Sequence, residues 1–224
     1  VLLFAMDSKG LAKQVLRRVG QCILTSPTTA CFSGLESDEK IDLGNAIRYF
    51  GDGFQVSKKI NDKKIWRIPV MEGEFVIEDK TSITNGIGGG NILIIGDSNQ
   101  EVLKSAEAAV KEMRKVNNII LPFPGGIVRS GSKVGSKYKS LIASTNDAYC
   151  PTLKGITKTK LSKSNESVLE IVIDGTNEKD ISLAMKKGIN IICKKFNKGI
   201  KSISAGNYGG KLGPYHFHLR NIMK

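Results

Sequence analysis

The sequence predicts an α+β protein with two lobes, because one pattern occurs three times along the 224-residue chain. In each copy an apolar run leads through a short polar segment into an amphipathic helix. The second and third copies are each followed by another strand and a glycine-rich segment. Two strand–helix–strand units joined in this way are typical of a ferredoxin-like βαββαβ sandwich. We therefore predict a C-terminal ferredoxin-like lobe over residues 73–224 and an incomplete, related N-terminal lobe over residues 1–72.

The N-terminal lobe begins with the first copy of the pattern. The run "VLLFAM" predicts a strand, and the chain continues through Asp7 into a helix that ends at Gly20. Because residue 1 is valine and not a start methionine, we expect a sequence truncated at its N-terminus, in which no signal peptide is visible. Residues 50–79 predict hairpin strands with turns at Gly51–Gly53 and Asn61–Asp62.

The two helices of the C-terminal lobe have clear start signals. Ser98 followed by Glu101 forms a capping box, and Asn177 is the expected cap of the second helix. Apolar residues at helical spacing then predict one buried stripe on each helix. The stripe of the first helix is Leu103, Ala106, Val110 and Met113, and that of the second is Ile181, Met185, Gly188 and Ile192.

One acid stands in a strand that is otherwise apolar. The stretch "VLEIVI", residues 168–173, is rich in β-branched residues and predicts a strand. Leu169, Ile171 and Ile173 share one face, and Glu170 lies on the opposite face between two valines. A strand that is apolar on both faces is usually covered on both. A carboxylate buried in such a strand costs free energy unless it is hydrogen-bonded or protonated. Glu170 is therefore a candidate for chemistry, and a buried acid with a purely structural partner is the alternative.

Composition excludes several classes of protein. Apolar residues make up 40% of the chain, and no apolar run approaches the about 20 residues that a membrane span needs. The four cysteines form no C-x-x-C pair, which favours a reducing, cytoplasmic setting. His216 and His218 would share one strand face, but two histidines do not make a metal site. The net charge of +13 reflects either a lysine-rich composition or a cleft that attracts anionic small molecules.

Glycine-rich and polar segments suggest where ligands bind. "AGNYGGKLG" fails the phosphate-loop pattern, because Ala205 stands at the first glycine position and Leu212 follows Lys211. Together with "PFPGGIVRSGSKVGSKY" and "NGIGGGN" it is consistent with a cleft lined by backbone, or with kinked strands. The loop "ASTNDAYCPT" is polar, and no G-x-S-x-G motif accompanies its serine, which argues against a serine hydrolase.

Eight strings, in this order, closely resemble the formylmethanofuran:tetrahydromethanopterin N-formyltransferase family. They are "GQC", "FGDGFQ", "VMEGEFVIED", "PFPGGIV", "GSKVGSK", "STNDAYCPT", "EIVIDGTNE" and "ISAGNYGGKLG". The resemblance runs from about residue 2 to the C-terminus, and family members carry a further N-terminal strand–helix stretch. Well-known archaeal members are strongly acidic, whereas this chain is basic.

The resemblance implies a cytoplasmic, homotetrameric acyltransferase of one-carbon metabolism that has two ferredoxin-like lobes and needs no metal or prosthetic group. Its co-substrates would be formylmethanofuran and tetrahydromethanopterin, in methanogenesis or in bacterial formaldehyde oxidation, where a formylmethanofuran hydrolase is a partner. The family's catalytic carboxylate falls on Glu170. The expected substrate-binding residues are Ser144, Thr145, Asn146, Asp147, Tyr149, Pro124, Gly125, Gly126, Lys133, Lys137, Asn207, Gly209, Gly210 and Lys211.

The chemistry of formyl transfer gives Glu170 a role. The attacking amine forms a tetrahedral adduct, and the departing amine leaves only when it is protonated, so the enzyme needs a proton shuttle and oxyanion donors. A glutamate in apolar surroundings has a raised pKa and can exchange a proton near neutrality. We expect Glu170 to be this shuttle. Thr145, Asn146 and glycine backbone amides are candidate oxyanion donors, and Lys133, Lys137 and Lys211 could bind the acidic groups of both substrates.

Two other functions stay open at this point. A non-catalytic subunit of a formyltransferase/hydrolase complex would keep the fold, but the intact Glu170 and "STNDAY" argue against it. A nucleic-acid-binding module would explain the basic charge, but such modules interleave aromatic and basic residues, and this chain does not.

Overall fold

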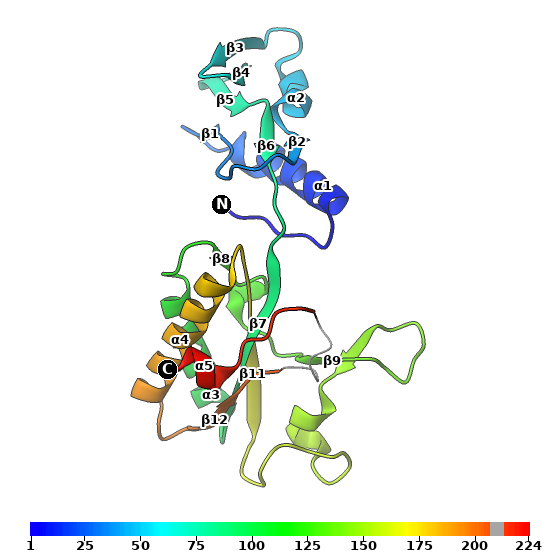
Figure 1. The fold of residues 1–224 in the computed structure, drawn as a ribbon, viewed down its shortest axis with the longest axis vertical. Coiled ribbons are helices and arrows are strands. Elements are labelled where there is room, and N and C mark those ends of the chain that lie inside the picture. Colours follow the sequence, from blue (N-terminus) through cyan, green and yellow to red (C-terminus); the bar gives the residue numbers. More distant parts are fainter. Residues whose placement is uncertain (207–212) are drawn as a thin grey trace. The chain divides into compact units, whose positions relative to one another are not determined.

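The computed structural model describes residues 1–206 and 213–224, which form two compact units, Val1–Asn85 and Gly86–Lys224 (Figure 1). Both units combine helices with β-sheet, so the predicted α+β class is confirmed. The compact units separate later in the chain than the predicted lobes do, because strand β5 (Gly73–Glu78) pairs with strands of the first unit.

The first unit is built on one helix and a four-stranded sheet. Helix α1 (Ser8–Arg18) is capped by Asp7, whose Oδ1 accepts the Gly10 N–H at 2.7 Å, and it continues into a π-helical turn, η1 (Val19–Ile23). The sheet has the strand order β1-β5-β4-β3. Its strands, besides β5, are β1 (Ala30–Cys31), β3 (Val56–Ile60) and β4 (Lys63–Val70). The remaining elements are β2 (Lys40–Asp42), α2 (Gly44–Ile47), η2 (Arg48–Gly51) and β6 (Lys80–Ser82).

Two predictions for this unit have different outcomes. Asn61 and Asp62 both have positive φ angles, 46° and 64°, and they form the tight turn of the β3–β4 hairpin, as predicted. The predicted strand at residues 1–6 is wrong, because this segment pairs with no strand among the described residues. A core cluster still forms between the helices and one sheet face. Its buried members are Val15, Val19, Leu43, Ile47, Trp66, Ile68, Phe75 and Ile77.

The second unit holds a four-stranded antiparallel sheet of order β12-β7-β11-β8. Figure 1 shows helices α3 and α4 side by side against the long strands β7 and β11. In chain order the elements of this layer pair are β7 (Ile87–Gly96), α3 (Asn99–Met113), β8 (Ile119–Ile120), β11 (Ser167–Gly175), α4 (Glu178–Lys195) and β12 (Ile200–Ser204).

A long excursion separates β8 from β11. Its short elements are η3 (Pro124–Gly126), β9 (Ser132–Val134), β10 (Ala143–Thr145), η4 (Asp147–Tyr149) and η5 (Pro151–Leu153). Within the described ranges 1–206 and 213–224, strands β9 and β10 pair only with each other. The chain ends with a short helix, α5 (Leu219–Ile222).

Both predicted helix starts are confirmed. Ser98 Oγ accepts the Glu101 N–H at 3.2 Å, and Asn177 Oδ1 accepts the Asp180 N–H at 2.9 Å. The α4 stripe is buried as predicted. On α3 one member was wrong, because Leu103 is 44% exposed and Val102 is fully buried in its place. Helix α3 presents the 102, 106, 109, 110 and 113 side chains to the core, which shifts the stripe by one residue at its start.

No helix among the described parts of the chain is both long enough and apolar enough to cross a bilayer.

Candidate active site

The predicted catalytic acid lies in the middle of the second sheet. Glu170 is on β11 and is only 4% exposed. Its backbone pairs with Val128 of the excursion, with N···O distances of 2.7 and 2.9 Å. Ile171 and Ile173 point the other way, into the core beneath α3 and α4, as the alternation predicted. The excursion therefore pairs with the same edge of β11 as β8 does. It pairs at Glu170, whereas β8 pairs at Asp174 and Gly175.

An asparagine that the sequence analysis missed holds the acid. Asn91 on β7 is 5% exposed, and its Nδ2 donates to Glu170 Oε1 at 2.6 Å. Asn91 Oδ1 in turn accepts the backbone N–H of Gly206 at 2.9 Å. In the sequence, Asn91 stands directly before the apolar run "ILII" in "NILIIG", at the start of the buried part of β7. A polar residue next to such a run was the signal in the sequence.

The second carboxylate oxygen of Glu170 lies beside a glycine. A methyl group placed on Gly131 would come within 3.1 Å of Glu170 Oε2. The carbonyl oxygen of Gly131 accepts the Asn146 N–H at 2.9 Å. Gly131 thus lies beside the acid and is hydrogen-bonded to Asn146 of the polar loop, so Asn146 and Glu170 lie in one neighbourhood.

The rest of the polar loop is held by its own contacts. Ser144 and Thr145 lie on β10, and Ser144 Oγ donates to the Gly135 carbonyl at 2.7 Å. The Thr145 hydroxyl lies 3.4 Å from the Cys150 thiol. Tyr149 is half-buried, and the Lys160 ammonium lies 5.7 Å from its ring centre. These contacts fix the loop as a unit beside the β9–β10 ribbon.

Lys133 and Asp147, both predicted to bind substrate, bind each other. Lys133 Nζ donates to Asp147 Oδ1 at 2.6 Å, and both side chains are partly exposed. The hydrogen bond from Lys133 lowers the pKa of the Asp147 carboxyl below its ordinary value. The Lys133 charge is therefore partly compensated inside the protein, whereas Lys137 is exposed.

Three of the predicted substrate-binding residues form a tight turn that has a structural reason of its own. Pro124, Gly125 and Gly126 form η3, and both glycines have positive φ angles, 67° and 84°. A methyl group on Gly126 would lie 3.1 Å from both Leu121 and Val110 side chains. The turn directs the chain toward Val128, so it shapes the approach to Glu170. Four further predicted residues, Asn207, Gly209, Gly210 and Lys211, lie outside the described residues.

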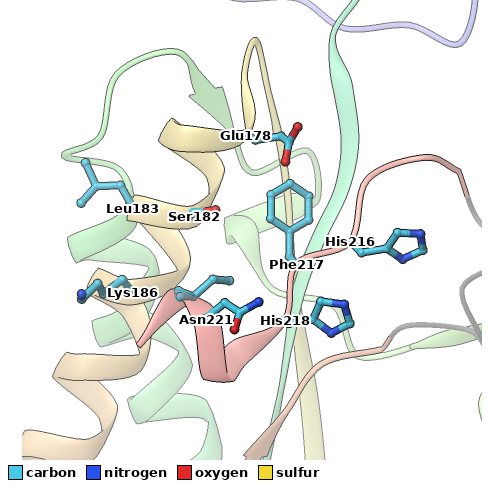
Figure 2. A pocket seen from close by; sticks show the side chains of 9 residues that line it. Glu178, Ser182, Leu183, Lys186, His216, Phe217, His218 and Asn221 are labelled. Atoms are coloured by element: carbon cyan, nitrogen blue, oxygen red, sulfur yellow. The ribbon is translucent and has the colours of Figure 1, made fainter. Parts of the chain in front are cut away.

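A surface pocket of about 280 Å³ lies elsewhere in the second unit (Figure 2). Glu178, Ser182 and Lys186 of α4 line one side of it, and His216 and His218 come from the segment before α5. Glu170 is not among its lining residues. The two histidine rings stack with centroids 6.2 Å apart. Their predicted strand is wrong, because residues 213–218 form no strand and lead into α5 instead.

Comparison with known proteins assigns both parts of the chain. A family model described as formylmethanofuran-tetrahydromethanopterin formyltransferase matches residues 1–70, and a model described as the proximal lobe of the same enzyme matches residues 73–222. A mixed α+β protein with this pair of matches is a formyltransferase, an enzyme that transfers an acyl group. The chain belongs to the formylmethanofuran–tetrahydromethanopterin formyltransferase family.

Relatives from bacteria and archaea agree with this assignment. The formylmethanofuran–tetrahydromethanopterin formyltransferase of Methylococcus capsulatus is 60% identical over 99% of this chain and 75% of its own length. A solved formyltransferase/hydrolase complex from Methylorubrum extorquens with methylofuran matches with a TM-score of 0.90 and 48% identity, over 97% of this chain and 73% of the matched one. The formyltransferase of Methanosarcina barkeri matches with a TM-score of 0.89 and 44% identity, over 97% and 74%.

The two family models meet between residues 70 and 73, close to the predicted lobe boundary, whereas the compact units of the structure separate after Asn85. The boundary at residues 72 and 73 stays a prediction.

Proposed function

We propose that this protein transfers a formyl group between formylmethanofuran and tetrahydromethanopterin, and that Glu170 moves the proton which the transfer requires. The observation that carries the proposal is a buried acid, 4% exposed, in a family member whose polar loop is hydrogen-bonded to Gly131 beside that acid. Active sites are where burial and neighbouring charges adjust acids for proton transfer.

The reaction needs two proton movements and no net proton. The acceptor amine nitrogen attacks the formyl carbon, a new C–N bond forms, and the carbonyl oxygen of the adduct becomes negative. The nitrogen of the attacking amine loses a proton, and the nitrogen of the departing amine gains one as the old C–N bond breaks. A single carboxyl group can accept the first proton and return it in the second step. We propose that no metal or prosthetic group takes part, because amide exchange needs only this shuttle and donors for the oxyanion.

The neighbourhood of Glu170 offers candidates for the other roles. Asn146 and Thr145 could supply oxyanion donors, since the Asn146 backbone is bonded to Gly131 beside the acid. Lys137 is exposed and can meet an acidic group of either co-substrate, and it is a better candidate for this than Lys133, which is paired with Asp147. The remaining predicted binding residues are Ser144, Tyr149, Pro124, Gly125 and Gly126, with Asn207, Gly209, Gly210 and Lys211 outside the described residues.

The finer architecture is also a proposal. The strand order β12-β7-β11-β8, with a helix after β7 and another after β11, supports a ferredoxin-like second lobe. We further propose a cytoplasmic homotetramer. Association with hydrolase subunits is supported by a 49% identical relative from Methylorubrum extorquens, which is named as one component of a formyltransferase/hydrolase complex.

Formyl transfer by the purified protein tests the proposal. The assay combines formylmethanofuran with tetrahydromethanopterin and compares the parent with Glu170→Gln and, as a matched control, Glu166→Gln on an exposed acid just before β11. We expect transfer by the parent, a kcat about 10²–10⁴-fold lower for Glu170→Gln, and an unchanged kcat for Glu166→Gln.

Two results would contradict the proposal. A folded parent that transfers no formyl group would be a non-catalytic subunit, which is the alternative function. A Glu170→Gln variant with parental kcat and parental melting temperature would leave the enzyme assignment intact but remove Glu170 from the mechanism.

A further inference from the structure

We propose that Lys133 and Asp147 are positioning residues, and that their ion pair holds the turn after β10 beside Gly131 without touching a co-substrate. The proposal rests on the function proposed above, because the turn begins at Asn146, a candidate oxyanion donor. It gives both members of the pair a role other than the substrate binding that the family resemblance implied for them.

The β-ribbon that leads into the turn is short. Strands β9 and β10 have three residues each, and their pairing places Lys133 opposite Ser144. The hydrogen bond from the Asn146 N–H to the Gly131 carbonyl extends the ladder by one step, and the chain then turns into η4. A two-stranded hairpin is at best marginally stable in water. The ribbon by itself is therefore a weak support for the turn.

The ion pair adds a second support where the ribbon ends. Lys133 Nζ lies 2.6 Å from Asp147 Oδ1, so a side chain of β9 contacts the first residue of η4, 14 positions further along the chain. The hydrogen bond from Lys133 lowers the pKa of the Asp147 carboxyl, and this group is therefore charged at neutral pH. The contact thus joins a cation of the ribbon to an anion of the turn.

A later segment holds the backbone of the same turn. The Lys160 N–H donates to the Ala148 carbonyl at 2.8 Å, and the Thr157 hydroxyl donates to the Asp147 carbonyl at 3.3 Å. The main chain of η4 is therefore held by residues that follow it, and the side chain of its first residue is held by β9. Without the ion pair, the turn would keep its backbone contacts but lose this side-chain connection to the ribbon.

Loss of the pair is expected to affect transfer more than folding. The Lys133 and Asp147 side chains are 42% and 32% exposed, and exposed ion pairs contribute little to stability. Groups that act on a reacting substrate must nevertheless be held closely, because a displacement of about 1 Å can cost about 10²-fold in rate. A small change in the position of Asn146 would therefore be visible in the kinetics before it was visible in a thermal melt.

Direct binding of a co-substrate by Lys133 predicts a different pattern of changes. If the Lys133 ammonium bound an acidic group of a co-substrate, Lys133→Met would raise KM. Asp147→Asn would then lower KM, because it removes the carboxylate that competes for the same ammonium. If the pair positions the turn, both substitutions lower kcat/KM, and KM does not change in opposite directions.

The test measures formyl transfer by the parent, Lys133→Met, Asp147→Asn and the double variant. We expect each single substitution to lower kcat/KM by about 10–100-fold and to lower Tm by at most about 4 °C. The double variant should be no worse than the single ones, because residues in contact are not additive. Lys133→Arg keeps the ion pair and should retain most of the parental kcat/KM. The control Lys115→Met removes an ion pair of the same N···O distance, 2.6 Å, to Glu112, and should keep the parental kcat/KM.

Hydrogen exchange provides a measurement that does not depend on activity. In the parent, the Asn146 N–H is protected by its hydrogen bond to the Gly131 carbonyl. We expect the peptide that contains Asn146 to exchange about 2–5-fold faster in Lys133→Met and in Asp147→Asn, which is the range that an exposed ion pair contributes. Lys115→Met should leave this exchange rate unchanged.

Several results would overturn the inference. They are opposite changes in KM for the two single variants, a parental kcat/KM in both, additive losses in the double variant, and parental exchange at Asn146 in both single variants. If a folded parent transfers no formyl group, the proposed function fails. The role of the pair in holding the turn is then decided by the exchange measurement alone.

Discussion

Replacing Gly96 by alanine tests how the central strand is packed against its edge neighbour. Gly96 ends β7, and a methyl group there would lie 2.6 Å from the Gly199 carbonyl oxygen and 2.6 Å from Val102 Cγ2. Carbon contacts are ordinarily about 3.5 Å or longer, so each contact is about 0.9 Å too short. The Val102 side chain is fully buried, and the Gly199 oxygen belongs to the backbone and accepts the Asp97 N–H at 3.3 Å. Neither neighbour can move without displacing β12 or α3.

Overpacking of this kind costs about 1–3 kcal/mol of unfolding free energy. For a chain of this length, that corresponds to a decrease in Tm of about 2–12 °C. The matched control is Gly88→Ala on the same strand, where the nearest atom to an added methyl group, Asp174 Oδ1, is at an ordinary 3.5 Å. Thermal melts of parent and both variants, followed by circular dichroism, measure the difference.

The same displacement has a functional consequence, because β12 leads to Gly206, whose N–H is bonded to Asn91. We expect Gly96→Ala to lower kcat at a temperature where the variant is still folded. Equal melting temperatures for Gly96→Ala and Gly88→Ala would refute the reasoning, because they would mean that the strand relaxes at no cost.

Two further predictions concern charge. Asp180 receives hydrogen bonds from Asn118 and Asn177, which lower the pKa of its carboxyl group, so its contribution to stability is present above the ordinary pKa of about 3.9 and is lost as pH falls through the lower, folded-state pKa. Asp180→Asn should therefore flatten the dependence of Tm on pH below about 5, and slopes identical to the parent's would contradict this. If the net charge of +13 attracts anionic co-substrates, kcat/KM should fall as salt rises from about 0.1 to 1 M and the Debye length shrinks from about 10 to 3 Å. A flat response would leave lysine-rich composition as the explanation.

Features set by neighbouring residues were predictable from the sequence. The caps Ser98 and Asn177 and the Asn61–Asp62 turn depend on hydrogen bonds and φ angles within three residues, and all were found as expected. The alternation around Glu170 also gave its face and its burial. Local signals of this kind carry their own physical reason.

Features set by distant contacts were not predictable. Asn91 donates to an acid 79 positions away, so its role depends on the register between β7 and β11. The space beside Gly131 exists only because the excursion returns to β11. Leu103 was placed in the core because its spacing fits a helical stripe, but the direction in which α3 meets the sheet selected Val102. Tertiary packing decided each of these cases.

The excursion between β8 and β11 contributes little to the core of the second unit. The residues that fold the sheet and the residues of this segment are therefore largely different. The fully enclosed core beneath α3 and α4 draws its buried members from β7, α3, Val116, β11 and α4, and not from residues 128–166. The excursion is attached to the acid at Val128 and to itself through Gly131 and Asn146. Because doubling the length of a flexible loop costs only about 0.6 kcal/mol, insertions at the tip, near residues 135–142, would leave the core and Glu170 in place. This segment can therefore change in length and sequence while the sheet that carries Glu170 keeps its core.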